Sequence, residues 1–372
     1  MDEKNVLIIG GAGFIGAHTA NELHRLGYNV TILDNLSPKV HNGSFPGHIN
    51  NGIAKILGDV RNEDDLLPLL SKNSVIYNFA SELDLNPDYS KFINVNVGGT
   101  ALIYELIKKY DLCIRKVIIA STQFVYGEGK YLDSVTGREY IPRTRKRADI
   151  ENFKFDFEID GRPLEYMSNV ESQKTSPPNH YALSKYFQEN FALTIGELNR
   201  IPTVILRYSI VHGPFQSLKN TYSGALRTFA IMIKNNIVIP TYEDNCSVRD
   251  FVSYQDVVSA NIKVLEDTRA DYQIFNVGGR RGYKVCELAD FIASYFGKDL
   301  SFSNNVEYRL GDVRKSISSN DKLESLGWSS CMSLETAISD FLDWFDGQNI
   351  DLENFLITQR VMRNNGSICR IN

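Results

Sequence analysis

The chain has 372 residues and an ordinary globular composition, with 43% hydrophobic and 23% charged residues and a net charge of -5. The acidic balance argues against nucleic acid or an anionic membrane surface as the main partner. No apolar run is long enough to span a bilayer, and the N-terminal residues lack the layout of a signal peptide. The five cysteines are scattered, without a C-x-x-C pair. We therefore expect a cytoplasmic protein with reduced thiols, no disulfide framework and no metal site.

The N-terminal segment has the pattern of a strand, a glycine-rich turn and a helix. Residues 6–9 form a continuous apolar run, as expected of a parallel strand covered on both faces. The glycines of residues 10–16 permit a tight turn and let backbone N–H groups approach a pyrophosphate at the start of a helix. A second strand, residues 28–33, ends at Asp34. A carboxylate there can accept hydrogen bonds from both hydroxyls of an adenosine ribose and would repel a 2′-phosphate. We therefore predict a dinucleotide site for NAD rather than NADP.

Further apolar runs of strand length alternate with helical patterns. They are strands at residues 54–57, 75–80, 116–120 and 203–208, and helices at residues 62–70, 94–110 and 181–198. This alternation predicts an α/β fold with a Rossmann-type doubly wound parallel sheet. Ligands of such sheets bind at the C-terminal ends of the strands. We therefore expect one edge of the sheet to carry Gly13, Asp34, Asp59, Ala80 and the pair Ser121–Thr122. Asp59 can equally be a helix cap.

Length and pattern divide the chain into two parts. We expect residues 1–212 to form the Rossmann domain and residues 213–345 to form mainly a smaller, mixed α/β C-terminal lobe. The lobe has helical patterns at residues 223–234, 254–265, 285–296 and 334–345, and strand patterns at residues 237–240 and 274–277. Residues 346–372 lose this periodicity and are interpreted as a tail that wraps either the core or a neighbouring chain. Residues 128–178 form an insertion that is too long for an ordinary loop. We expect it to cover the active site; a surface excursion is the alternative.

The helical run that begins at Tyr181 carries a candidate acid/base pair. Tyr181 and Lys185 are four residues apart, which places them on one face of a helix. A free tyrosine, with a pKa of about 10, is a poor base at neutral pH, but a fixed ammonium nearby favours the phenolate. The pair could therefore transfer a proton. The same spacing is common on ordinary half-exposed helix faces, so its context has to decide.

The order and spacing of these features resemble one family. The glycine loop, Asp34, the stretch at residues 121–127 and the pair Tyr181 and Lys185 are similar to the extended short-chain dehydrogenase/reductase superfamily, and within it to the NAD-dependent nucleotide-sugar epimerases and dehydratases. Residues 127–131 and 213–224 resemble dTDP-L-rhamnose 4-epimerase-like members, beside UDP-glucose 4-epimerase-like ones. Two departures concern the sugar: the insertion lacks the family's cysteine knuckle, and Ile210 replaces an asparagine that often meets the substrate.

The resemblance implies a role for each matching residue. The expected catalytic residues are Thr122, Tyr181 and Lys185. The expected contacts to NAD are Gly10, Gly13, Phe14, Ile15, Asp34, Asn35, Asp59, Val60, Phe79, Ala80, Ser81, Asn96, Tyr181 and Lys185. The expected contacts to a nucleoside-diphosphate sugar are Thr122, Gln123, Arg249 and Arg309. Asn78 departs from the histidine that is usual two residues before Ala80. A homodimer is also expected.

The reaction implied is epimerisation, at C4 by preference, of a nucleoside-diphosphate hexose or 6-deoxyhexose through a transient keto-sugar. The related dehydratases carry an Asp-Glu pair directly after the catalytic threonine, where this chain has Gln123 and Phe124. Neither side chain can ionise, so neither can supply the second acid/base pair that expulsion of water needs. An acid from the insertion, Glu128 or Asp133, could replace them. The alternatives are a 4,6-dehydratase, a decarboxylase, a 4-reductase and a non-enzymatic NAD-binding sensor or scaffold.

Overall fold

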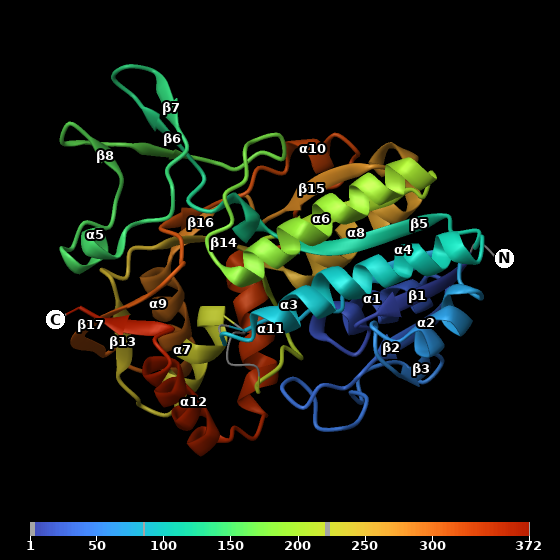
Figure 1. Cartoon of the computed structure of the whole chain (residues 1–372). Coiled ribbons are helices and arrows are strands. Elements are labelled where there is room, and N and C mark those ends of the chain that lie inside the picture. Colours follow the sequence, from blue (N-terminus) through green and yellow to red (C-terminus); the bar gives the residue numbers. More distant parts are fainter. Residues whose placement is uncertain (1–3, 85, 220–223, 372) are drawn as a thin grey trace.

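The computed structural model of the protein describes residues 4–84, 86–219 and 224–371, and its centre is a seven-stranded parallel sheet (Figure 1). The strands, in the order in which they lie side by side, are β15 (Gln273–Val277), β11 (Thr203–Tyr208), β5 (Lys116–Thr122), β4 (Val75–Asn78), β1 (Asn5–Ile9), β2 (Asn29–Asp34) and β3 (Ala54–Leu57). The order reverses between β1 and β4, which is where doubly wound sheets bind ligands. The predicted Rossmann-type fold is confirmed.

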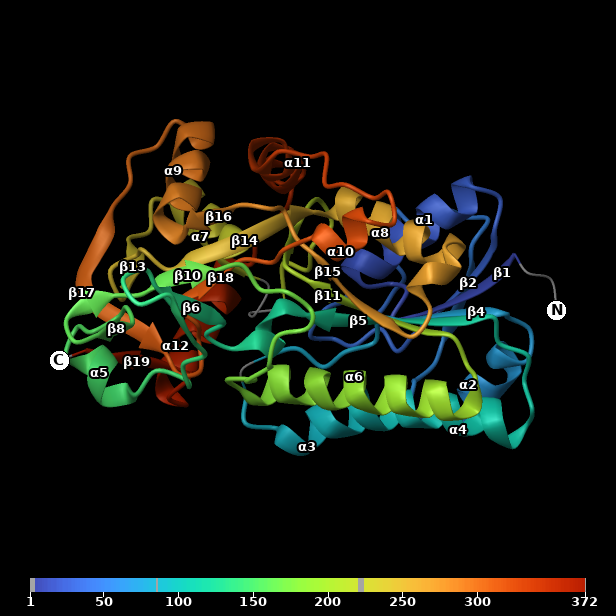
Figure 2. The same ribbon diagram turned by 90° about the horizontal axis from the view of Figure 1, so that it is seen from above.

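Helices cover both faces of this sheet, as its continuously apolar strands require. Figure 2 shows α1 (Phe14–Arg25) and α8 (Tyr254–Glu266) on one face. The other face carries α2 (Glu63–Leu70), α4 (Gly99–Lys109) and α6 (His180–Asn199). A short helix, α3 (Tyr89–Phe92), and a π-helical turn, η1 (Ile93–Gly98), lead into α4. Each face therefore has its own apolar core.

A second lobe is built around its own core of three helices and small sheets. The helices are α7 (Gly224–Lys234), α9 (Val285–Phe296) and α11 (Leu334–Asp346). One sheet joins β12 (Ile210–His212), β14 (Val248–Ser253), β16 (Gly282–Lys284) and β18 (Lys315–Ser316), and another joins β13 (Ile239–Tyr242), β17 (Phe302–Arg309) and β19 (Ile368–Arg370). The first residue of the predicted helix 223–234, Ser223, lies outside the described residues.

The predicted boundary at residue 212 does not separate the two lobes. After β14 the chain returns to the Rossmann part as α8, the short turn η3 (Thr268–Ala270) and strand β15, which pairs with β11. The short helix α10 (Asp321–Glu324) also packs on β15. The predicted lobe 213–345 therefore contributes one strand and two helices to the Rossmann part.

The insertion forms a small β-rich arm, seen at the upper left of Figure 1. It contains β6 (Lys130–Asp133), β7 (Arg138–Tyr140), α5 (Arg147–Glu151), β8 (Glu158–Ile159), β9 (Arg162–Pro163) and β10 (Glu165–Met167). Its contacts run to the second lobe. The buried side chain of Arg145 pairs with Glu243 of the second lobe at 2.8 Å and, within the insertion, with Glu128 at 3.0 Å; Arg314 of the second lobe pairs with Asp156 at 3.0 Å. Such paired charges explain why a segment without clear periodicity is ordered.

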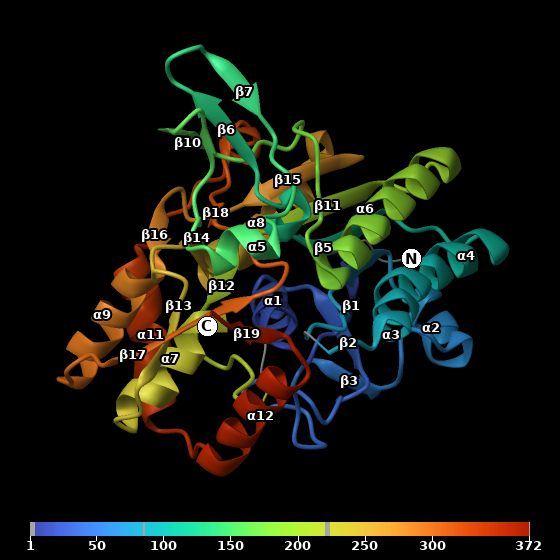
Figure 3. The same ribbon diagram turned by 60° about the vertical axis from the view of Figure 1, so that its left-hand side comes forward.

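The tail folds back on the second lobe and does not extend away from the molecule. It forms α12 (Leu352–Asn364) and then β19, which pairs antiparallel with β17 (Figure 3). Phe355, Met362 and Ile368 are buried there. Of the two interpretations of residues 346–372, wrapping of the core therefore describes the structure.

Within the described ranges, no helix combines the length and the apolar character needed to cross a membrane, and no group of three or more potential metal ligands is found. The five cysteines are all free thiols.

Candidate active site

One cavity of about 930 Å³ lies between the two lobes, at the C-terminal edge of the parallel sheet. Three regions meet in its wall: the glycine loop and the strand ends, the first turns of α6, and the second lobe. Its lining includes Gly10, Gly13, Phe14, Ile15, Phe79, Ser81, Thr122, Tyr181, Lys185, Arg249 and Arg309 from the predicted set. The cavity therefore brings together most of the residues that the sequence assigned to cofactor, catalysis and substrate.

The glycine loop (residues 10–16) forms a cradle at the start of α1, and Gly10 and Gly16 pack against neighbouring backbone too closely for a side chain. Gly10 has φ +77°, and a Cβ there would lie 2.6 Å from the backbone nitrogen of Ala80. A Cβ on Gly16 would lie 2.4 Å from the carbonyl oxygen of Gly10. Helix α1 begins directly afterwards at Phe14, with its first N–H groups at the cavity. This cradle fits the pyrophosphate of a dinucleotide.

Asp34 supports the cradle from behind. Its carboxylate accepts hydrogen bonds from the backbone N–H of Ala12 at 3.0 Å and of Leu36 at 2.9 Å. It lies at the end of β2, as predicted, and His41, which lines the cavity, has its Nε2 3.7 Å from a carboxylate oxygen. Asp34 is buried and is not itself among the described lining residues. Its contact with an adenosine ribose stays a prediction.

Asn35, Asp59 and Val60 form a second group, next to the cavity but outside its lining. The Asn35 side chain donates to Asp59 at 3.0 Å. Hydrogen bonds from Arg61 are the largest cause that holds the pKa of Asp59 well below its usual range. Val60 is buried against the start of α4 at Gly99. Their predicted contacts to adenosine remain untested.

Asn96 has a structural connection that the sequence did not show. It lies in the π-helical turn η1, a rare geometry that is frequent at functional sites. Its Nδ2 donates to Ser184 Oγ at 2.9 Å, and its Oδ1 accepts from the backbone N–H of Glu82 at 2.8 Å. Asn96 is fully buried and ties α6 to the loop after Ala80. Asn78 is also buried, and its Nδ2 donates to Thr100 Oγ1 at 3.0 Å. Neither residue, nor Ala80, lines the cavity.

The predicted catalytic residues meet at the start of α6 and the end of β5. Tyr181 and Lys185 are buried one turn apart in α6, and Asn179 caps the helix by accepting from the backbone N–H of Ala182 at 2.9 Å. Burial lowers the pKa of Lys185, which is 2% exposed, to about 7, although Glu189 opposes this shift. Thr122 ends β5 and caps the 3₁₀ turn η2 (Gln123–Tyr126). These groups can together hold and move a proton.

Behind the pair lies a buried ion pair that sequence reasoning missed. Glu189 accepts a short hydrogen bond from Ser121 Oγ and pairs with Arg207 at 2.7 Å. Arg207 also lies over the ring of Tyr126, 4.8 Å from its centroid. The spacing of Lys185 and Glu189, again four residues, was the available signal. This group fixes α6 against β5 and β11.

Gln123 is not among the described lining residues, and its predicted contact with the substrate stays a prediction. Its side chain is buried, and its Oε1 accepts from Ser209 Oγ at 3.2 Å. Phe124 lines the cavity in its place. Ser209 lies far along the chain, so the inward position of Gln123 depends on a contact between distant residues.

The second lobe adds positive charge to the cavity wall. Arg249 is buried on β14 and its Nη2 pairs with Asp312 at 2.8 Å. Arg309, at the end of β17, lies over the ring of Tyr242, 5.0 Å from its centroid. Burial raises the pKa of Asp312, but Arg249, Arg309 and Arg145 together hold it below its usual value.

Two further contributions to the lining were not predicted. Arg227 lines the cavity from α7, and the tail supplies Gln348, Asn349, Ile350, Asp351, Asn354, Phe355 and Thr358. An arginine inside the otherwise apolar run 225–233 was the visible signal for Arg227. The described lining contains no residue of 128–178, and the predicted role of the insertion in covering the site stays untested.

Comparison with known families gives this site its context. The profile of the NAD dependent epimerase/dehydratase family matches residues 6–147 and 159–278. The chain belongs to this family. The predicted family and the predicted cofactor, NAD, are thereby confirmed, and the cradle at Gly10 and Gly16 agrees with them.

Individual members of the family are similar along nearly the whole chain. The dTDP-L-rhamnose 4-epimerase of Burkholderia thailandensis is 30% identical over 95% of this chain and 98% of its own length. A putative UDP-glucose 4-epimerase of Methanocaldococcus jannaschii is 30% identical over 92% and 99%. Among solved structures, the UDP-glucose 4-epimerase of Thermotoga maritima, with UDP-glucose, has a TM-score of 0.75 at 25% identity and covers 92% of this chain and 98% of that one. The predicted enzyme class is confirmed.

Proposed function

We propose that this family member is an NAD-dependent epimerase that inverts C4 of a nucleoside-diphosphate hexose or 6-deoxyhexose. The observation that carries the proposal is the meeting of Thr122, Tyr181 and Lys185 in one cavity, beside a dinucleotide cradle and facing Arg249 and Arg309. The similarity to a dTDP-L-rhamnose 4-epimerase and to a putative UDP-glucose 4-epimerase supports the choice of carbon.

In this proposal the protein's side chains remove and return the proton of the C4 hydroxyl. Tyr181 Oη removes the proton of the C4 hydroxyl and later returns it. The ammonium of Lys185 stabilises the Tyr181 phenolate and would contact the ribose that carries the nicotinamide of NAD. Thr122 Oγ1 donates a hydrogen bond to the reacting oxygen and holds it in place. NAD, when bound, supplies reversible hydride acceptance. The sugar turns over in the cavity between the two halves of the reaction, so that its opposite face meets the cofactor.

The second lobe holds the substrate by its diphosphate. Arg249 and Arg309 supply charge-assisted hydrogen bonds, which are stronger than neutral ones. Because these contacts are to the diphosphate, the sugar keeps the freedom to rotate that inversion requires. Asp312 keeps Arg249 oriented when no substrate is present.

The acids that could convert the site into a dehydratase are committed elsewhere. Glu128 accepts from Arg145 at 3.0 Å and from the backbone N–H of Arg314 at 2.8 Å. Asp133 accepts from Arg162 at 3.2 Å and from the backbone N–H of Val135 at 3.0 Å. Neither is among the described lining residues. Gln123 is also turned away, so none of these three side chains supplies, in the described lining, the second acid/base pair that dehydration needs.

The reaction is tested by incubation with UDP-, dTDP-, CDP- and GDP-linked hexoses and 6-deoxyhexoses. We expect at least one product of unchanged mass, with altered proton couplings at C4 and an equilibrium reached from both sides. A product lighter by one water would identify a dehydratase, and loss of carbon dioxide from a uronic acid would identify a decarboxylase. The nucleotide released from the purified protein should be NAD(H); preferential binding of NADP would contradict the role of Asp34.

We also propose a cytoplasmic homodimer. Leu183 and Phe187 lie one turn apart on α6 and are 40% and 44% exposed, and Tyr89 and Ile93 are exposed on the neighbouring α3 and η1. A second copy would cover this apolar face. Light scattering should give twice the chain mass for the unaltered protein and the chain mass for Phe187→Glu. The five free thiols are compatible with a reducing compartment.

A further inference from the structure

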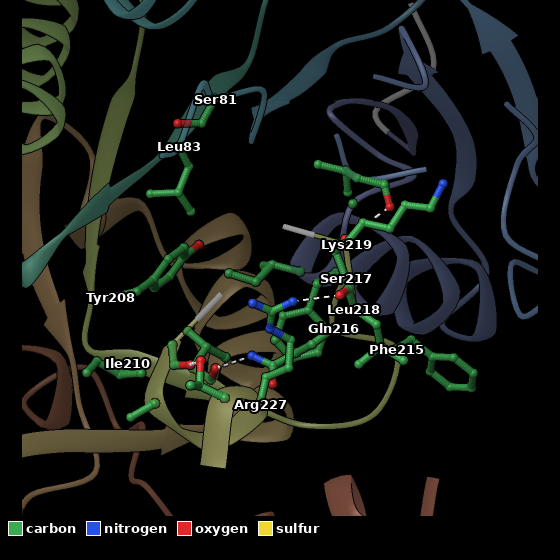
Figure 4. Close-up of a pocket in the computed structure, with 18 of the residues that line it drawn as sticks. Ser81, Leu83, Tyr208, Ile210, Phe215, Gln216, Ser217, Leu218, Lys219 and Arg227 are labelled. Carbon is green, nitrogen blue, oxygen red and sulfur yellow. Dashed lines mark hydrogen bonds between the residues drawn. The ribbon is translucent and has the colours of Figure 1, made fainter. Parts of the chain in front are cut away.

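Arg227 is a buried cation that the proposed mechanism does not use. It lies on α7, is 1% exposed and lines the cavity. Figure 4 shows its guanidinium group reaching in among the lining residues. One nitrogen, Nη1, donates to the carbonyl oxygen of Leu218 at 2.6 Å, and the group lies 5.9 Å from the ring centroid of Phe355 on α12. Throughout the part of the chain that the structure describes, no hydrogen-bond partner exists for Nε or Nη2.

The two unpartnered nitrogens form one edge of the guanidinium group. Other arginines of this chain use the same edge to bind both oxygens of a carboxylate. Arg61 binds Asp59 in this way at 2.8 Å through each nitrogen, and Arg363 binds Glu307 at 2.7 and 3.0 Å. Two parallel N–H groups fit the two oxygens of a carboxylate or a phosphate. Arg227 thus presents the edge that recognises such groups, already fixed in direction by its bond to Leu218.

Among the described residues, no acid forms an ion pair with Arg227. Burial and the nearby charge of Arg309 lower the pKa of Arg227 to about 10, so the guanidinium group is still charged at neutral pH. A buried charge without a partner is strongly unfavourable. The same cavity also holds the Tyr242 hydroxyl and the Oε1 of Gln216, which are buried without a hydrogen-bond partner in the described structure. Several unsatisfied polar groups in one cavity indicate a polar ligand.

We propose that Arg227 binds two oxygens of an anionic group of the substrate through Nε and Nη2. The inference rests on the proposed function, because it takes the substrate to be a nucleoside-diphosphate sugar. Two parts of such a molecule carry this chemistry: the diphosphate, where Arg227 would act beside Arg309, and a carboxylate on the sugar. A purely structural Arg227 would need only the Nη1 bond to Leu218, which a lysine could replace.

The test measures binding to the NAD-loaded protein by calorimetry. The proteins are the unaltered enzyme, Arg227→Met, Arg227→Lys and the control Arg269→Lys, which removes the same two-nitrogen edge from a surface pair with Asp267. The probes are UDP, dTDP, CDP and GDP, followed by the glucose and glucuronic acid conjugates of the diphosphate that binds the unaltered protein most tightly. Unfolding temperatures are measured first; if Arg227→Met does not fold, Arg227→Lys carries the test.

We expect both Arg227 variants to bind more weakly by on the order of 10- to 100-fold, and the control to bind as the unaltered protein does. Weakening for the free diphosphate and both conjugates places the diphosphate at Arg227. Weakening for the glucuronic acid conjugate alone places a carboxylate there. Unchanged affinity for every probe in a folded variant, or failure of all probes to bind the unaltered protein, overturns the proposal.

The outcome is separate from that of the proposed reaction. If Arg227→Lys epimerises the substrate with the KM of the unaltered enzyme, the proposed function stands and the proposed role of Arg227 is wrong. If nucleotide binding depends on Arg227 but no epimer is formed, the proposed role of Arg227 stands and the proposed function is wrong.

Discussion

The side-chain amide of Asn179 donates a hydrogen bond of 3.2 Å to the carbonyl oxygen of Gly311, two residues from Arg309. The same side chain caps α6 through the backbone N–H of Ala182. One residue therefore joins the start of the helix that carries Tyr181 to the loop that carries Asp312. This hydrogen bond therefore fixes the position of Tyr181 relative to Arg249 and Arg309 of the second lobe.

Asn179→Ala should lower both stability and turnover. Loss of the cap costs about 0.5–2 kcal/mol of unfolding free energy, and loss of the bond to Gly311 loosens the second lobe against α6. Asn62→Ala is the matched control, because Asn62 caps α2 through the backbone N–H of Asp64 at 3.0 Å. Urea unfolding should show similar losses in both variants, whereas kcat should fall only in Asn179→Ala. Equal kcat values in the two variants would show that the hydrogen bond from Asn179 to Gly311 does not affect turnover.

Tyr181→Phe should lose turnover while it keeps its fold and its bound NAD. The change removes one hydroxyl and keeps the ring, and a general acid/base contributes typically about 10²–10⁴-fold. Tyr186→Phe, five residues further along α6, is the control and should keep the full rate. Steady-state kinetics with the identified nucleotide sugar gives both values. If Tyr181→Phe retained more than about a tenth of the rate, another group would have to transfer the proton.

The stability of the NAD-free protein should depend on pH through Lys185. Burial lowers its pKa to about 7, below the value of about 10.4 for an unfolded chain. Between these values the unfolded state binds more protons than the folded state, so the free energy of unfolding rises with pH. Below about pH 7 both states are charged and this contribution is flat. Urea unfolding of the unaltered protein and Lys185→Met at pH 6, 7, 8 and 9 should show the difference growing in favour of the unaltered protein above pH 7. A constant difference would show that Lys185 titrates near its ordinary pKa.

Arg249→Ala should act on binding more than on chemistry. Removal of a charge-assisted contact to the diphosphate costs about 1.5–3 kcal/mol, which corresponds to an increase of roughly 10- to 150-fold in KM, with a smaller change in kcat. Asp312 keeps the neighbouring charges of Arg309 and Arg145, so the loss of its partner is partly compensated. Arg269→Ala, which breaks the surface pair with Asp267, should leave KM unchanged. An unchanged KM in Arg249→Ala would place the diphosphate elsewhere.

The Rossmann part was predictable from the sequence because its signals are local. An apolar run such as residues 6–9, followed by a glycine-rich turn, is typical of a strand buried on both faces. At Gly10 and Gly16 the structure shows the steric reason for glycine, because a Cβ there would clash with neighbouring backbone. The pair Tyr181 and Lys185 has helical spacing, and its place after the glycine loop, Asp34 and residues 121–127 in the sequence singles it out. These features need no knowledge of distant contacts.

The remaining parts depend on contacts between distant residues. The insertion is ordered by ion pairs such as Arg145 with Glu243, which no periodicity reports. Gln123 was expected at the substrate because it follows Thr122, but Ser209, far along the chain, binds it inside. Arg227 stands out in the sequence as a charge within a largely apolar helical run, but its position next to Phe355 of α12 is known only from the structure. Helix α12 itself buries Phe355, Gln359 and Met362, and it obtains its order from the surface on which it packs.

The return of the chain to the central sheet has a consequence for how the protein folds. β11 and β15 are neighbours in the sheet, yet everything from β12 to α8 lies between them in the sequence. Part of the second lobe, from β12 to β14, therefore lies in a long loop that must close before β15 can pair, and contacts of such large sequence separation slow folding. Neither lobe is a contiguous segment that could be expressed alone: a chain cut after residue 212 would lack α8 and leave an edge of β11 open. The enzyme should refold slowly, with the sheet and the substrate lobe reaching their native state in the same kinetic phase.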